Sequence, residues 1–282
     1  MRSRAPVLAV LIAALALFAP TPAAAQQQTG VAQAKVARAL ALFRADAMER
    51  RRDGRIVFGP ETGADGEREA RRRQAREWLR EAATAGEAQG RELYGKMLEY
   101  GVGGEAQPTR ARALYADAGT RLARWRLGRM LEQGRGGPKD MVSARRLYRL
   151  ASKAGQIDAA YDHARLLRAG LGGPKDPIAA RAELERTTGF CHGDAADELA
   201  EMAGRGEGGA RDVELAATQH LRALGCRDGA FAPPAVLARW RSIERDVRIE
   251  IQRRLAAEGR YSGPIDGEAR GATMAKALQP GR

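Results

Sequence analysis

The side chains that most often carry chemistry are few and scattered in this sequence. Its 282 residues contain three histidines, His163, His192 and His220, and two cysteines, Cys191 and Cys226. None of the histidines has a further ligand at a spacing that suits a metal site. His192 directly follows Cys191, but adjacent side chains rarely point at each other, and a third orienting group is missing. We therefore predict no enzyme, no metal site and no cofactor.

The most prominent pattern is a glycine-rich tag that recurs along the chain. It reads Gly-Arg-Gly-Gly-Pro-Lys-Asp at 134–140 and Gly-Leu-Gly-Gly-Pro-Lys-Asp at 170–176. Weaker copies begin at 101 and 206, so the steps between copies are 33, 36 and 36 residues. The tags lack the Gly-Lys-Ser/Thr ending of a phosphate-binding loop. A period in the thirties is typical of a solenoid of stacked helix pairs. One alanine per copy keeps the same step: Ala111, Ala144, Ala180 and Ala216.

Each tag also contains signals that end one helix and begin the next. Its first glycine suits the left-handed residue that stops a helix. Its aspartate suits the N-cap, because the carboxylate can accept a bond from a free backbone N–H. The helix before the tag carries a small residue, such as Gly128 or Ala164, which allows close helix packing. The predicted structural positions are Gly101, Gly134, Gly170 and Gly206 as stops, and Asp140, Asp176 and Asp212 as caps.

The repeats resemble the Sel1-like repeat family, which is related to the tetratricopeptide repeats. The residues that carry the resemblance are the run from Leu127 to Asp140, then Ala144, the pair Leu147-Tyr148 and the run 151–155. The match extends over roughly residues 75–226. The resemblance implies an all-α superhelical solenoid that binds a protein partner or a polymer on its concave face and is not catalytic.

The tail carries a second pattern, formed by Gln252, Leu255, Gly259, Tyr261, Gly263, Ile265, Asp266, Gly267 and Thr273. In these residues it resembles a small three-helix domain of the peptidoglycan-binding type. That family shows Gln-x-x-Leu, then Gly-Tyr-x-x-Gly-x-Asp-Gly, then a threonine that opens the last helix. Here Ala269 and Arg270 depart from the pattern, which leaves a wall-binding pocket and a relic that only caps the solenoid as alternatives. The wall-binding residues that the resemblance implies are Gln252, Leu255, Tyr261, Ile265, Asp266 and Thr273.

The beginning of the chain has the pattern of a secretory signal. Arg2 and Arg4 precede an apolar run from Val7 to Phe18, and three alanines stand before Gln26. The alternative is a membrane anchor, but the run is shorter than the ~20 residues that a spanning helix needs. We predict export to the periplasm. A bridge between the two cysteines is allowed in that compartment, although neighbouring repeats usually stack farther apart than the Cα spacing of a disulfide.

The formal net charge is +13, and export makes nucleic acid an unsuitable partner for it. Anionic envelope components are one alternative, and a solvated arginine-rich surface is the other. After residues 26–30, a polar leader, we expect a helix from Val31 that covers the first repeat or binds a partner.

The predicted organisation is a signal peptide (1–25), an N-terminal helix and loop (26–66), the solenoid (67–232) and a small helical domain (233–282). We expect an envelope scaffold that binds a protein and is tethered to peptidoglycan. The alternative is a periplasmic regulator that binds a membrane sensor.

Overall fold

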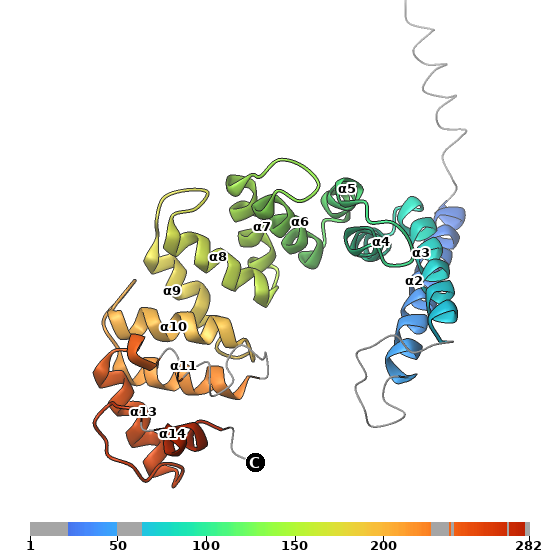
Figure 1. Cartoon of the computed structure of the whole chain (residues 1–282). Coiled ribbons are helices and arrows are strands. Elements are labelled where there is room, and N and C mark those ends of the chain that lie inside the picture. The colour runs from blue at the N-terminus through green and yellow to red at the C-terminus, as the bar shows by residue number, and fades with distance from the viewer. Residues whose placement is uncertain (1–21, 50–63, 227–236, 238–239, 270, 280–282) are drawn as a thin grey trace, which may run out of the picture. The chain divides into compact units, whose positions relative to one another are not determined.

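A computed structural model describes residues 22–49, 64–226, 237, 240–269 and 271–279. These residues form helices and contain no strand, which confirms the all-α prediction. None of these helices is both long and apolar enough to cross a bilayer. Most of the predicted signal segment, residues 1–21, lies outside the described residues. The chain divides into two compact units, Met1–Thr120 and Arg121–Arg282 (Figure 1).

In the first unit, α2 packs against α3 and α4 through the buried residues Ala32, Val36 and Ala39. The polar leader at 26–30 was predicted not to be helical, and that prediction was wrong. Its three glutamines have good helix propensity, and the helix includes this segment. The glycines and the proline within 53–66 predict a loop over these residues. That loop is too long, because α3 already begins at Ala64; residues 50–63 lie outside the described residues. The helices are α2 Pro22–Glu49, α3 Ala64–Thr84, α4 Ala88–Tyr100 and α5 Pro108–Ala118.

In the second unit, the helices from α6 to α11 pack in chain order, and α13 packs on α11 (Figure 1). The alanine that recurs with the tag is fully buried in every copy. The elements are α6 Arg121–Gln133, α7 Met141–Lys153, α8 Ile157–Ala169, α9 Pro177–Glu185, α10 Gly193–Arg205, α11 Val213–Gly225, η1 Trp240–Ser242, α13 Arg245–Ala257 and α14 Gly271–Ala277.

In each repeat we call the helix before the tag the first helix and the helix after it the second helix. The small residue of the first helix makes room for a side chain of the second helix. A Cβ on Gly128 would lie 2.7 Å from the ring of Tyr148. The Tyr148 hydroxyl then donates to Glu132 at 2.7 Å. One repeat later the pair is Ala164 and Leu184, which lie in one buried cluster. Where alanine replaces glycine on the first helix, leucine replaces tyrosine on the second, so the summed volume stays similar and the interior stays close-packed.

The tags end and begin helices in the way that their residues allow. The four stop glycines have φ between 69° and 72°, which is the left-handed region. Asp140 accepts a bond from the Ser143 N–H at 2.9 Å, and Asp176 and Asp212 cap their helices in the same way. Each aspartate therefore satisfies a backbone donor that the first turn of a helix leaves free.

A second glycine lies against the backbone of the preceding repeat in three of the tags, at Gly103, Gly172 and Gly208. A Cβ on Gly172 would come within 2.2 Å of the Met141 carbonyl oxygen, and one on Gly208 within 2.1 Å of the Pro177 oxygen. Arginine side chains span the same joint: Arg181 donates to the Ala210 carbonyl at 2.8 Å. Neighbouring repeats are thus joined by backbone contact that only glycine permits.

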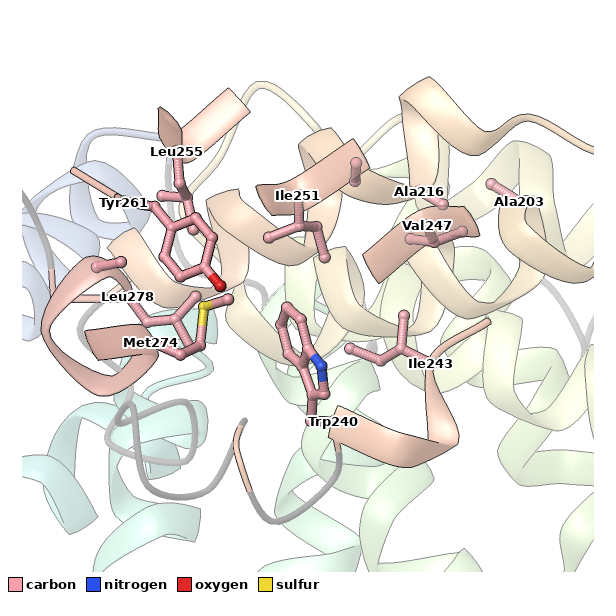
Figure 2. Packing of buried hydrophobic residues seen from close by; sticks show 12 residues of the cluster. Ala203, Ala216, Trp240, Ile243, Val247, Ile251, Leu255, Tyr261, Met274 and Leu278 are labelled. Atoms are coloured by element: carbon pink, nitrogen blue, oxygen red, sulfur yellow. The ribbon is translucent and has the colours of Figure 1, made fainter. Parts of the chain in front are cut away.

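The C-terminal segment completes the core of the last repeat (Figure 2). Val247, Ile251 and Leu255 form one buried stripe on α13, facing Ala203 and Ala216 of the solenoid. The spacing of these three apolar residues at i, i+4 and i+8 predicts one helix from about 235 to 258. That prediction was wrong, because the helix is interrupted. A 3-10 turn at 240–242 directs an indole into the core, and α13 begins only at 245. The other large members of this cluster are Trp240, Ile243, Tyr261, Met274 and Leu278.

Candidate functional site

Three of the six tail residues implied in wall binding lie in the interior. Gln252 is fully buried; its amide nitrogen donates to the Glu268 carbonyl at 2.9 Å, and its oxygen accepts from the Gly267 N–H at 2.7 Å. Leu255 is fully buried as well, and the Tyr261 hydroxyl donates to the Pro264 carbonyl at 3.0 Å. These residues hold the tail in shape through contacts within the chain.

The other three tail residues lie nearer the surface. Ile265 is 46% exposed, and Thr273 is exposed within α14, which begins two residues earlier. Asp266 accepts a bond from the Glu268 N–H at 2.9 Å, a turn contact typical of aspartate. The structure therefore divides the predicted set between interior and surface.

Cys191 and Cys226 form a disulfide, with Cα atoms 5.2 Å apart. The bridge joins the residue before the α10 cap to the residue that ends α11. His192 is that cap: its Nδ1 accepts from the Ala195 N–H at 3.1 Å. Both residues thus act on the chain's own conformation.

The partly exposed side chains of the first helices form a continuous polar row in the second unit. The Trp125 indole N–H donates to Asp162 at 2.7 Å, which fixes the ring across two repeats. Arg165 forms an ion pair with Glu132 and lies 3.7 Å from Asp162. Burial raises the pKa of Asp162, although the bond from Trp125 and the charge of Arg165 act against it. The guanidinium of Arg129 lies 5.1 Å from the Trp125 ring centre.

The row continues from α8 to α10. The ring of Tyr161 lies 5.1 Å from the His192 ring, and burial, with the charges of Asp194 and Glu198, raises its pKa to about 12. Arg168 donates to Glu198 at 2.7 Å and to Glu207 at 2.6 Å. We call six residues along this row the first-helix face; Arg129 is exposed and the other five are partly exposed: Trp125, Arg129, Asp158, Tyr161, Arg165 and Glu201.

The remaining histidines pair with carboxylates inside the stack. His163, which aligns with apolar residues of other repeats, is buried and lies 3.1 Å from Glu183. Ser152 donates to the same carboxylate at 2.6 Å. Burial raises the pKa of Glu183, but the bonds from His163 and Ser152 outweigh it, so the pKa stays below its ordinary value. His220 lies 3.0 Å from Asp197. Within the part of the chain that the structure describes, no three potential metal ligands gather.

Sequence reasoning did not single out Trp125, Tyr161 or Arg168. The signal was nevertheless present, because the two aromatic residues lie 36 positions apart, one repeat step. Residues in the same phase of consecutive first helices must lie side by side on one face. The same repeat period therefore predicts both the buried positions and the residues of this row.

The comparisons with known proteins agree with this architecture. Two solved structures share the fold: a Sel1 repeat protein from Oxalobacter formigenes (19% identity, TM-score 0.55) and c5321, a protective antigen of uropathogenic Escherichia coli (16% identity, TM-score 0.56). The alignments cover 73% of this chain and 90% of the first protein, and 90% of this chain and 61% of the second. No curated protein matches.

The family described as Sel1 repeat matches five segments of the chain, which together make up more than half of its length. Such repeats typically form scaffolds for protein–protein interaction rather than catalytic sites. The matched segments are 61–87, 89–119, 121–156, 157–182 and 193–218. The chain therefore belongs to the Sel1 repeat family.

Proposed function

We propose that this protein is an exported, non-catalytic scaffold of the cell envelope that binds a protein partner along the first-helix face. The observation that supports the proposal best is the pair Trp125 and Tyr161. Both aromatic rings are partly exposed on consecutive repeats, and the Trp125 ring is fixed by a hydrogen bond. Rigid aromatic residues lose little conformational entropy on binding, so they are the residues on which interfaces most often depend.

The charge of the first helices changes along this face, from basic at α6 to acidic at α10. The sequence of α6 contains four arginines and one glutamate, whereas α10 contains one arginine and four acidic residues. Many of the acidic residues of α10 already have basic partners inside the stack. A partner with acidic residues towards α6 and basic residues towards α10 would match it, and this complementarity would favour one orientation of the partner.

Site-specific cross-linking tests this interaction. A photoreactive residue at Tyr161 should give a defined protein adduct in cells, and Trp125→Ala should reduce it at least tenfold. The control position is Ile178, which is 71% exposed on a second helix and lies outside the face. Equal adducts from both positions would refute recognition by the first-helix face. The adduct also distinguishes an assembly partner from the sensor domain of a membrane protein.

Export is supported by the pattern of residues 1–25 and by the bridge between Cys191 and Cys226, since disulfides persist in oxidising compartments. A fusion of alkaline phosphatase to the C-terminus should be active in cells. Deletion of residues 2–25 should abolish that activity.

For the C-terminal segment we propose a role as the cap of the solenoid. Its apolar residues are continuous with the core of the last repeat, and a terminal repeat needs such a cover. Tethering to peptidoglycan is decided by sedimentation with purified sacculi. Binding that disappears when exposed Ile265 is changed to Asp, in a protein of unchanged melting temperature, would establish the tether.

A further inference from the structure

Two places in the stack are equivalent by register but differ in chemistry. The repeat steps add up to 69 residues, 33 plus 36, between the first unit and the repeat that contains Glu183. By this count Tyr94 stands where His163 stands, Leu114 where Glu183 stands, and Ala83 where Ser152 stands. The later repeat therefore fills this place with its own hydrogen-bonded carboxylate, whereas the first unit supplies none.

In the first unit the equivalent place is an open groove of 370 Å³. It lies over α3, α4 and α5, and Ala83, Ala113 and Leu114 give it an apolar part. Three guanidinium groups surround it, one from each helix, and one acidic residue contributes to the rim. The lining residues are Arg80, Ala83, Thr84, Arg91, Tyr94, Arg110, Ala113, Leu114 and Asp117.

Tyr94 of α4 contributes a phenol to this groove. The residue as a whole is 5% exposed, and it is one of the side chains that line the groove. Glu77, through a hydrogen bond and its charge, raises the pKa of Arg80, and Tyr94 contributes weakly, which places the phenol near that guanidinium.

The arginines of α4 and α5 are not neutralised by the chain. Arg91 donates to the backbone carbonyls of Ala83 at 3.4 Å and Asp117 at 3.3 Å. Arg110 donates only to the neutral side chain of Gln107, at 2.7 Å. Neither has a carboxylate partner among the described residues. Guanidinium groups bind carboxylates strongly because two parallel N–H groups match the two oxygens.

We propose that this groove binds a carboxylate side chain of a polypeptide partner, in the place that Glu183 occupies in the later repeat. The apolar surface of Ala83, Ala113 and Leu114 suits the methylene groups that carry a glutamate carboxylate. Tyr94 and Arg110 supply donors of the kind that His163 and Ser152 supply to Glu183. The groove belongs to the first unit, so this inference does not depend on the first-helix face.

Titration of the full chain with short peptides, followed by amide NMR shifts, tests the chemistry. The probes are acetyl-Leu-Glu-Leu-amide, its glutamine analogue and inorganic phosphate. We expect the glutamate peptide to shift amides of α3 to α5 and to bind at least tenfold more tightly than the glutamine peptide. Equal binding of both peptides, or tighter binding of phosphate, would overturn the proposal.

Two variants test the location. Arg110→Glu should weaken the glutamate peptide at least tenfold, whereas Arg73→Glu, the same charge change at a site 71% exposed on α3, should change its affinity less than twofold. Leu114→Glu should fill the groove with an internal carboxylate, as in the later repeat, and exclude the peptide at an unchanged melting temperature. A folded Leu114→Glu protein that still binds like the wild type would contradict the proposal.

Discussion

The joints between repeats and the joint to the C-terminal segment hold the second unit together by different means. Between repeats, backbone meets backbone, because Gly172 lies where any Cβ would strike the Met141 carbonyl oxygen. At the last joint, side chains meet side chains, with Val247 and Ile251 in one cluster with Ala203 of α10 (Figure 2). The first kind of joint is steric and local, and the second depends on buried apolar area.

In both regions, the residues that belong to recognisable sequence motifs set the conformation of the backbone. The glycine tags shape helix ends and joints, and Gln252 with the Asp-Gly turn shapes the tail. Such residues are repeated because the fold needs them in every copy. Recognition should therefore be sought among positions that change from one repeat to the next, as Trp125 and Tyr161 do.

The largest effect should come from the joint between repeats. Gly172→Ala should lower the free energy of unfolding by about 4 kcal/mol, because left-handed strain and a clash with the Met141 carbonyl add together. Gly134→Ala is the matched control. It has the same left-handed φ, but its Cβ would meet nothing closer than 3.6 Å, so we expect a loss of only about 1–2 kcal/mol. Urea denaturation measures both, and equal losses would show that the close approach contributes nothing.

Gln252 gives the corresponding test in the C-terminal segment. Gln252→Leu should cost about 3 kcal/mol, because the Gly267 N–H and the Glu268 carbonyl both lose a buried partner. Tyr261→Phe should cost about 1 kcal/mol, since it removes the hydroxyl that donates to the Pro264 carbonyl and accepts a longer bond from Gln252. Thermal unfolding measures both. A Gln252→Leu protein of unchanged stability that lost binding to sacculi would instead make this residue a ligand contact.

The packing of a first helix against its second helix should give an intermediate effect. Gly128→Ala should cost about 2 kcal/mol, because the new methyl group would lie 2.7 Å from the Tyr148 ring. Tyr148→Leu in the same protein should recover part of this loss by copying the pair Ala164 and Leu184 of the next repeat. A double-mutant cycle from urea denaturation measures the coupling, and strictly additive losses would argue against matched volumes.

Local signals in the sequence predicted the repeats well. The left-handed glycines and the aspartate caps each depend on a residue and its immediate neighbours, so the period was enough to locate them. The start of α2 was missed because glutamine is as compatible with a helix as with a leader. The break before α13 was missed because it depends on Trp240, whose indole N–H donates to the distant Gly267 carbonyl at 2.8 Å.

The groove around Tyr94 could not be predicted from composition, although the repeat period was enough to align Tyr94 with His163. Its positive charge depends on which arginines form an ion pair with a carboxylate within the fold. Arg168 has several, whereas Arg91 and Arg110 have none among the described residues. The +13 net charge left a solvated surface and an anionic partner equally open, and only the pairing separates the two kinds of arginine.

The smallest predicted effect concerns pH and the cluster of Glu183. The folded pKa of this carboxyl is lower than its ordinary value, because the hydrogen bonds from His163 and Ser152 outweigh burial. Its contribution to stability is therefore complete above the unfolded pKa and is lost as the pH falls through the folded pKa. Glu183→Gln should make the free energy of unfolding less dependent on pH in the acidic range, while Glu77→Gln tests an exposed carboxyl whose pKa is lowered by Arg80. Exposed ion pairs contribute little to stability, so only Glu183→Gln should flatten the pH profile. Urea denaturation at several acidic pH values measures the free energy of unfolding of both variants. The same slope in both would mean that the buried cluster stabilises the stack no more than a surface pair does.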